Sequence, residues 1–224
     1  MVTDLIKQDI VIIEATENGT KYKVKEVAFD KKTGYEILKR VFDIVASFCA
    51  ILICFIPMIF IAIAIVLDSE GGAVYSQERL GKNGKPFMLY KFRTMRIDAE
   101  KNGAQWATAN DDRCTKVGTF LRKTRLDELM QLINIFKGDM SIVGPRPERK
   151  IFYDEFATYI DGFDRRLLIK PGLTGLAQIS GGYDLKPEEK IIPDVQYIET
   201  RNIWLDIKII FKTVAIVFNH NGAR

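Results

Sequence analysis

The chain has 224 residues, of which 47% are hydrophobic, and a formal net charge of +4. This length and composition fit one globular domain with appended segments. The small, mixed charge excludes an acidic tail or a histone-like protein, and no RNA- or DNA-binding motif is present, so we do not expect nucleic acid as a partner. The three cysteines form neither a CxxC metal pattern nor a disulfide framework, which is typical of a reducing cytoplasm.

The first readable pattern is a β-hairpin, predicted at residues 9–29. An apolar run at residues 10–13 and a second alternating segment flank the turn dipeptide Asn18-Gly19. We expect residues 1–34 to form an N-terminal extension. It would pack on the rest of the chain or contact a second copy in a homodimer.

The next segment, residues 44–67, carries no charge and is long enough to cross a hydrocarbon core of roughly 30 Å. Hydropathy alone would give a single spanning anchor. However, Pro57 interrupts the run and should kink the helix. Basic residues also flank both ends, so the positive-inside rule gives no orientation. We therefore expect residues 35–67 to form a re-entrant membrane helix kinked at Pro57, with both flanks in the cytoplasm.

The remaining residues, 68–224, are predicted to form a cytoplasmic domain. Residues 68–96 are rich in glycine turns and strand-like, whereas a helical period dominates from residue 116 onward. Gly138 follows one helical apolar stripe and is expected to end that helix. That stripe consists of Leu129, Leu132, Ile133 and Phe136. The predicted fold class is therefore α+β and mostly helical.

A broad apolar face is predicted on a helix near the end of the chain, with Lys208 and Lys212 on its other side. Such a helix could lie in the membrane interface, or it could be an ordinary helix that faces the core. Both interpretations stay open on the sequence. The face contains Trp204, Ile207, Phe211, Val214 and Phe218.

The strongest candidate for chemistry is the adjacent pair Asp127 and Glu128. The only histidine is His220, so acid–base chemistry by histidine is nearly excluded and a carboxylate must carry any reaction. A structural explanation is also open, because Thr124 could cap a helix whose first turn contains the acidic pair.

Arginines near this pair favour a reaction at phosphorus. Arg122 and Arg125 lie within five residues of Asp127. Arg146 stands between Pro145 and Pro147, whose fixed φ angles limit its direction. Cations keep a carboxylate ionised, as a nucleophile toward phosphorus must be, and they stabilise pyrophosphate oxygens.

Three further patterns extend this picture. Residues 126–147 read LDELMQLINIFKGDMSIVGPRP, residues 90–95 read YKFRTM, and residues 170–178 read KPGLTGLAQ. Together, and in the order that the family has them between residues 35 and 218, they closely resemble the bacterial sugar transferase family. These are monotopic phosphoglycosyl transferases, which transfer a sugar-1-phosphate from a UDP-sugar to polyprenyl (undecaprenyl) phosphate.

The resemblance implies roles for the acidic pair. Asp127 would attack the β-phosphorus of the UDP-sugar, giving a covalent aspartyl sugar-phosphate and releasing UMP. Glu128 would position the phosphate or support a metal. A Mg²⁺ ion held by Asp127 and Glu128 is implied, because a hard cation shared by carboxylate and phosphate oxygens assists phosphoryl transfer.

The resemblance also implies that Arg122 and Arg146 bind phosphate. Asp194 and Asp206 match acidic positions near the family's site, with a plain helix-surface role as the alternative. Lys91 and Arg93 are further candidates for substrate phosphate, with anionic lipid as their alternative partner. The glycines at 172, 175, 181 and 182 either shape a loop or let a loop cover the substrate.

The sequence thus predicts an enzyme on the cytoplasmic face of the bacterial inner membrane that starts the assembly of a surface polysaccharide or glycoconjugate. The alternative is a membrane-anchored interaction module whose arginines bind anionic lipid. An aspartyl-phosphate hydrolase is disfavoured because its Asp-x-Asp pattern is missing. No motif encodes the donor sugar or the final glycan.

Overall fold

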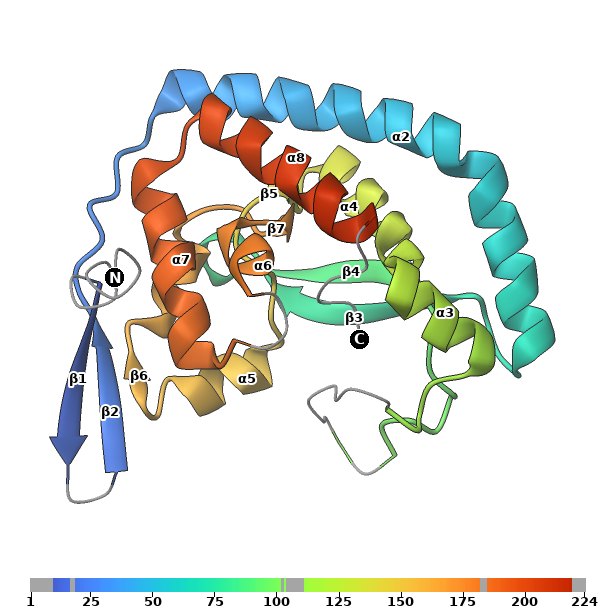
Figure 1. Ribbon diagram of the computed structural model, residues 1–224, viewed down its shortest axis with the longest axis horizontal. Coiled ribbons are helices and arrows are strands. Elements are labelled where there is room, and N and C mark those ends of the chain that lie inside the picture. Colours follow the sequence, from blue (N-terminus) through green and yellow to red (C-terminus); the bar gives the residue numbers. More distant parts are fainter. Residues whose placement is uncertain (1–9, 17–18, 102, 104–110, 182–184, 219–224) are drawn as a thin grey trace.

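The computed structural model describes residues 10–16, 19–101, 103, 111–181 and 185–218. Helices predominate, and the strands form three small sheets with the orders β1-β2-β6, β3-β4 and β5-β7. Figure 1 shows that the long helix α2 arches over the other elements. The predicted mixture of helix and strand, with helix in the majority, is therefore confirmed.

The predicted N-terminal hairpin is confirmed, although Asn18 of its turn lies outside the described residues. Strand β1 (Val11–Thr16) pairs antiparallel with β2 (Gly19–Val24), and β2 pairs in parallel with β6 (Ile160–Asp161). Val11 and Val24 are buried in one apolar cluster with Phe163 of the following domain. The hairpin therefore shares a core with the elements that follow it.

Helix α2 (Thr33–Asp68) is a single helix that continues through Pro57. By length and composition it could cross a membrane, and only 6% of its most apolar part is buried. Figure 1 shows its ribbon running along the top of the molecule and then turning down the right side. The re-entrant hairpin and its kink at Pro57 stay predictions.

The inner side of α2 supports the domain beneath it. Ile51 packs on the cluster of Leu132 and Ile135, and Ile65 is buried in another cluster with Phe92. The buried carboxylate of Asp43 also accepts hydrogen bonds from the Ser141 hydroxyl at 3.1 Å and the Ile142 amide at 3.0 Å. Helix α2 and the strand that carries Ser141 are thus joined by both apolar and polar contacts.

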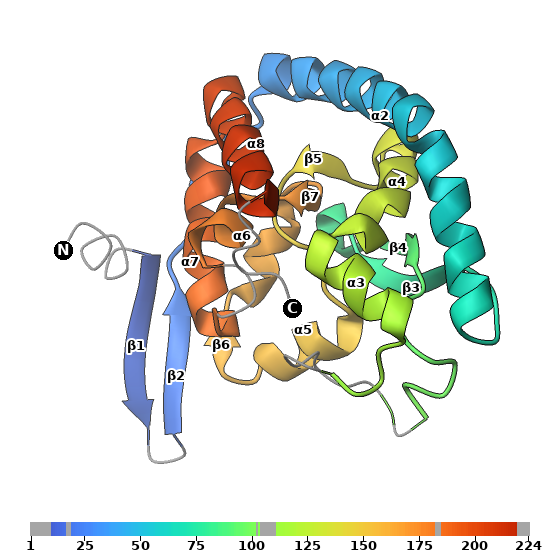
Figure 2. The ribbon, with the colours of Figure 1, turned by 45° about the vertical axis from the view of Figure 1, so that its right-hand side comes forward.

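The elements that form the domain follow in chain order, and Figure 2 shows α3 and α4 on the inner side of the descending half of α2. They are β3 (Val74–Leu80), η1 (Lys82–Gly84), β4 (Pro86–Phe92), α3 (Lys116–Thr124), η2 (Leu126–Met130), α4 (Gln131–Lys137), β5 (Ser141–Val143), α5 (Lys150–Phe156), η3 (Phe163–Leu168), β7 (Gly172–Thr174), α6 (Leu176–Ser180), α7 (Pro187–Thr200) and α8 (Ile203–Phe218). The strand-like character of residues 68–96 is confirmed by the antiparallel pair β3 and β4.

Two expectations about helix ends had different outcomes. Gly138 ends α4 with a left-handed φ of 97°, as predicted. Thr124, however, does not cap the helix of the acidic pair, so that prediction was wrong. Thr124 is the last residue of α3, and its hydroxyl donates back to the Phe120 carbonyl at 2.9 Å. A Ser or Thr can bond backwards in this way at the end of a helix, and spacing alone did not distinguish the two uses.

The predicted C-terminal amphipathic helix is confirmed as α8, and it uses two faces. Ile209 and Asp206 are buried, whereas Trp204 and Phe211 are 77% and 72% exposed. One face therefore packs on the core, while the other presents large apolar side chains outward. This arrangement supports an interfacial location for the outer face.

Candidate active site

The Asp127-Glu128 pair follows a sharp turn between two helical segments. Arg125, which separates α3 from η2, has a φ of 58° and a ψ of 15°, a left-handed conformation that is uncommon for residues other than glycine. The turn brings Arg122, in the last turn of α3, within electrostatic reach of Asp127. Both carboxylates are buried, each with 9% of its surface exposed.

Strand β4 brings a lysine to the pair. The buried amide of Asn134, on α4, accepts from the Tyr90 N–H at 3.0 Å and donates to the Met88 carbonyl at 2.7 Å. These bonds fix β4 against α4 and so hold Lys91 near Asp127. The Lys91 ammonium also lies 5.3 Å from the centre of the Tyr75 ring, in a cation–π contact.

Glu128 is paired with the arginine of the Pro-Arg-Pro segment. The Arg146 guanidinium donates to Glu128 Oε1 at 2.6 Å. Burial acts to raise the pKa of Glu128, but the charge and hydrogen bond of Arg146 outweigh it and hold the pKa below its ordinary value. Glu128 is therefore ionised at neutral pH, and it orients Arg146.

Asp127 has a different electrostatic environment. Burial raises its pKa to about 6, and the negative charge of Glu128 acts in the same direction. Lys91, Arg146 and Arg122 oppose both effects. At pH 7 the Asp127 carboxylate is thus mostly ionised and poorly solvated, a state that suits a nucleophile.

Positive charge is concentrated around the pair. Burial lowers the pKa of Lys91 to about 8, Asp127 opposes this shift, and repulsion from Arg79, Arg122 and Arg146 adds to it. Cations that repel one another in this way are stabilised when an anion binds among them. The predicted grouping of Lys91, Arg122 and Arg146 around Asp127 and Glu128 is therefore present, and its contact with substrate stays a prediction.

Thr94, which the sequence did not indicate, positions Arg122. Its hydroxyl accepts from Arg122 Nε at 3.0 Å. One turn earlier on α3, Gly118 packs so tightly on Thr94 that an added Cβ would overlap the Thr94 carbonyl. The end of the YKFRTM segment thus fixes both α3 and its arginine.

The backbone of the Pro-Arg-Pro segment is anchored to β7. The Gly144 amide donates to the Thr174 carbonyl at 2.8 Å, and the Gly172 amide donates to the Pro145 carbonyl at 2.9 Å. A Cβ on either glycine would overlap backbone of the opposite strand. The loop-shaping interpretation of Gly172 is therefore confirmed, whereas Gly182 lies outside the described residues.

Asp194 does not approach the acidic pair directly. It binds Arg166 Nε at 2.6 Å, and both side chains are 1% exposed. Arg166 in turn donates to the Arg146 carbonyl at 2.9 Å. Asp194 thus supports the loop of Arg146 through Arg166, a residue that no sequence motif singled out, and its predicted substrate contact stays a prediction.

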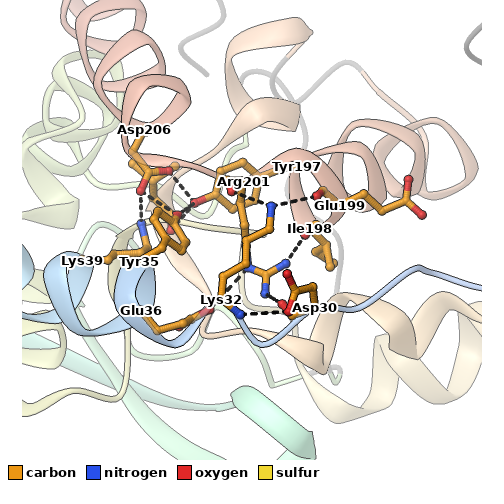
Figure 3. Close-up of polar contacts among 11 residues, drawn as sticks. Asp30, Lys32, Tyr35, Glu36, Lys39, Tyr197, Ile198, Glu199, Arg201 and Asp206 are labelled. Atoms are coloured by element: carbon orange, nitrogen blue, oxygen red, sulfur yellow. Dashed lines mark hydrogen bonds and ion pairs between the residues drawn. The ribbon is translucent and has the colours of Figure 1, made fainter.

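Asp206 lies in a separate polar cluster (Figure 3). It accepts from the hydroxyls of Tyr197 at 2.6 Å and Tyr35 at 2.8 Å, and from the Lys39 ammonium at 2.7 Å. These contacts join α8 and α7 to the start of α2. Asp206 therefore lies in a buried junction between helices, and its predicted substrate contact stays a prediction.

Arg93 is bonded to backbone in this structure. Its guanidinium donates to the backbone carbonyls of Ser69, Glu70 and Gly71, at the end of α2. Carbonyls at the end of a helix lack intrahelical donors, and arginine commonly satisfies them. The described contacts of Arg93 thus join it to the end of α2, and its phosphate contact stays a prediction.

The predicted Mg²⁺ can be compared with the available donors. Among the described residues there is no group of three or more His, Cys, Asp or Glu side chains that could hold a metal ion. Mg²⁺ is commonly bound by one or two carboxylates together with substrate phosphates and water. The adjacent, mutually repelling carboxylates of Asp127 and Glu128 fit that mode of binding.

The family of this chain can be assigned from its sequence. Residues 34–220 match the family model described as bacterial sugar transferase, so the chain belongs to that family. The acidic pair, the Pro-Arg-Pro segment and α2 all lie inside the matched range, whereas the hairpin of β1 and β2 lies before it.

Among curated relatives, the chain is 41% identical over 193 residues to the UDP-N-acetylgalactosamine-undecaprenyl-phosphate N-acetylgalactosaminephosphotransferase of Aeromonas hydrophila, covering 85% of this chain and 46% of the relative. It is 42% identical over 192 residues to the UDP-glucose:undecaprenyl-phosphate glucose-1-phosphate transferase of Escherichia coli, with coverages of 84% and 41%. It is 41% identical over 207 residues to the undecaprenyl-phosphate galactose phosphotransferase of Salmonella typhimurium, with coverages of 86% and 43%. The chain thus spans less than half the length of these relatives.

Proposed function

We propose that this protein transfers a sugar-1-phosphate from a UDP-sugar to undecaprenyl phosphate and so initiates the assembly of a bacterial surface polysaccharide or glycoconjugate. The observation that carries this proposal is the buried carboxylate pair among Lys91, Arg122 and Arg146. A carboxylate that only capped a helix would not need three cations around it. The names of the three relatives support the choice of substrates.

In the first step, an Asp127 carboxylate oxygen attacks the β-phosphorus of the UDP-sugar. The new bond is an acyl phosphate, and the bond from this phosphorus to the bridging oxygen breaks. The electron pair stays on that oxygen, which leaves as part of UMP. Arg122 and Lys91 would stabilise the charge on the transferring phosphate.

In the second step, a phosphate oxygen of undecaprenyl phosphate attacks the same phosphorus. The bond to Asp127 breaks, the carboxylate is restored, and the sugar remains joined to the lipid by a pyrophosphate. Dividing the transfer in this way lets one binding site serve two substrates in turn. Glu128 remains ionised throughout because it is paired with Arg146.

The same residues fit the implied cation. Asp127 and Glu128 would hold Mg²⁺ together with the donor's phosphate oxygens, where it would neutralise charge on the departing UMP. Glu128 would remain the more constant ligand, since its ion pair with Arg146 orients it.

The proposed location is the cytoplasmic face of the inner membrane, with α2 dipping into the bilayer and returning. Three observations support it: the exposed apolar surface of α2, Pro57 within it, and the apolar outer face of α8. A homodimer through the hairpin stays a prediction.

The proposal is tested with detergent-purified protein, Mg²⁺, undecaprenyl phosphate and a panel of UDP-sugars, by measuring UMP release. We expect UMP from one or a few donors, and the relatives' different donors make a panel necessary. Binding of anionic vesicles without UMP from any donor would favour the interaction module instead.

A further inference from the structure

A cavity of about 220 Å³ opens beside the acidic pair, and most of its surface is apolar. It lies between η2, α4, β7, α6 and α8. Its apolar walls include Leu132, Leu173, Ile210 and Val217. A cavity of this kind takes a hydrocarbon group rather than a sugar nucleotide, since a nucleotide needs several polar partners.

The polar part of its wall adjoins the site already described. Glu128 and Arg125 both line the cavity. Gln178 lines it as well, and both polar atoms of the Gln178 amide are buried without a hydrogen-bond partner among the described residues. A buried amide without partners costs folding free energy, and its N–H group is available to donate to an acceptor on a bound ligand.

We propose that this cavity holds the isoprene units of the acceptor lipid nearest to its phosphate, with the Gln178 amide donating to a phosphate oxygen. The inference rests on the proposed function, which supplies a lipid phosphate as the second substrate. It adds where that lipid enters and which side chain recognises its head.

The placement brings the acceptor beside the residue that follows Asp127. The attacking phosphate has to reach the phosphorus joined to Asp127, and Glu128, the next residue, is shared by the acidic pair and the cavity wall. Arg125 adds a positive charge at the same wall. The acceptor therefore approaches from the α8 side of the pair.

The rest of the lipid needs a route to the bilayer. The cavity is too small for a complete polyprenyl chain, but α8 forms one wall and carries Trp204 and Phe211 on its exposed face. If that face lies in the membrane interface, the remaining isoprene units pass directly from the cavity into the hydrocarbon. A phospholipid acyl chain would match the walls, but it lacks the terminal phosphate monoester that must meet Gln178 and Asp127.

The direct test is photo-crosslinking with an undecaprenyl phosphate analogue that carries a diazirine on the isoprene unit nearest to the phosphate. We expect labelled peptides from β7, α6 and the second half of α8. Unlabelled undecaprenyl phosphate should compete, and phosphatidylglycerol should not. Label confined to α2, or equal competition by phosphatidylglycerol, would overturn the proposal.

Two variants test the walls and the amide separately. Val217→Trp fills the cavity and should weaken binding of the analogue at least about tenfold. The indole ring would occupy the space of a few methylene groups of the lipid, whose burial would be lost. Phe211→Trp, on the exposed face of the same helix, is the matched control and should leave binding unchanged. Equal binding by Val217→Trp and Phe211→Trp would contradict the assignment of the cavity.

Gln178→Leu keeps a similar volume and tests recognition of the phosphate even if Val217→Trp folds poorly. It should weaken binding of undecaprenyl phosphate and leave binding of undecaprenol, which has no phosphate, unchanged. Equal losses for both lipids would overturn the role of the amide. Acceptor-independent UMP release by the wild-type protein reports on the proposed function alone, so the two failures are distinguishable.

Discussion

Asp127 and Glu128 are adjacent in the chain but differ in their proton affinity. Arg146 binds Glu128 at 2.6 Å and lowers its pKa, whereas burial and Glu128 itself raise the pKa of Asp127 to about 6. Glu128 is therefore an oriented, permanently charged partner, whereas Asp127 is a poorly solvated carboxylate. It favours Asp127 as the nucleophile without reference to any relative.

The raised pKa of Asp127 has a consequence for folding stability. Because the folded-state pKa lies above the ordinary value of 3.8, the folded protein is favoured when Asp127 is protonated, and stability is lost as the pH rises through about 6. Asp127→Asn should therefore raise the free energy of unfolding at pH 8 by roughly 2–3 kcal/mol. The gain should disappear near pH 4. Thermal melts across this pH range measure it.

Asp161→Asn, at an exposed position on β6, is the control, and its free energy of unfolding should not show this pH-dependent gain. A destabilised Asp127→Asn variant at pH 8 would show that the charged carboxylate is satisfied in the free protein, contrary to the electrostatics described above.

Arg146 gives a second prediction at the scale of one residue. Arg146→Lys should lower the rate of UMP release about ten- to hundredfold, because one lost charged hydrogen bond is worth roughly 1.5–3 kcal/mol. A single ammonium cannot reproduce planar donors that would bind Glu128 and a substrate phosphate together. Steady-state rates at saturating donor provide the measurement.

Arg149→Lys is the matched control, since Arg149 pairs with Glu100 and stands three residues further along the chain. Its rate should stay near that of the wild type. If Arg146→Lys retained the wild-type rate as well, Arg146 would act only as a general positive charge.

At the scale of elements, the site depends on how α3 meets β4. Gly118→Ala should be strongly destabilising although alanine favours helix, because the new Cβ would overlap the Thr94 carbonyl. The displaced α3 would also move Arg122. Gly34→Ala, in the first turn of α2, has open space around its Cβ and should be neutral or stabilising by about 0.5–1 kcal/mol. Chemical denaturation of the two variants tests the contrast, and equal stabilities would refute it.

The elements also show what a sequence can and cannot predict. Local patterns predicted the hairpin of β1 and β2, the helix stop at Gly138 and the helix α8, since each depends on spacing or a turn residue within one segment. Thr124 was misassigned because its hydroxyl can bond toward either helix. The support of Arg146 by Arg166 and Asp194 was not predictable, because these residues are brought together only by tertiary packing.

The same distinction applies to the candidate site. Asp127, Glu128 and Arg146 were indicated by motif and charge, and the structure brings them together. Arg93, Asp194 and Asp206 were predicted near them, but each makes its described contacts elsewhere. A charged side chain in a family motif can serve the fold as well as the reaction, and only its partners distinguish the two.

At the scale of the whole molecule, both flanks of α2 should lie on one side of the membrane. In a background without the natural cysteines, new cysteines at positions 20 and 100 are both exposed and suited to labelling. An impermeant thiol reagent added to intact cells should label neither, and both should react after lysis. Labelling of only one position in intact cells would indicate a single spanning helix instead.

The central claim is that the sugar-phosphate is held covalently on Asp127. Purified protein is incubated with its UDP-sugar and Mg²⁺ in the absence of acceptor, and peptides are analysed by mass spectrometry. We predict a stoichiometric burst of UMP and a sugar-phosphate adduct on Asp127, which undecaprenyl phosphate removes and Asp127→Asn lacks. UMP release that requires the acceptor, with no adduct on any peptide, would contradict the covalent mechanism.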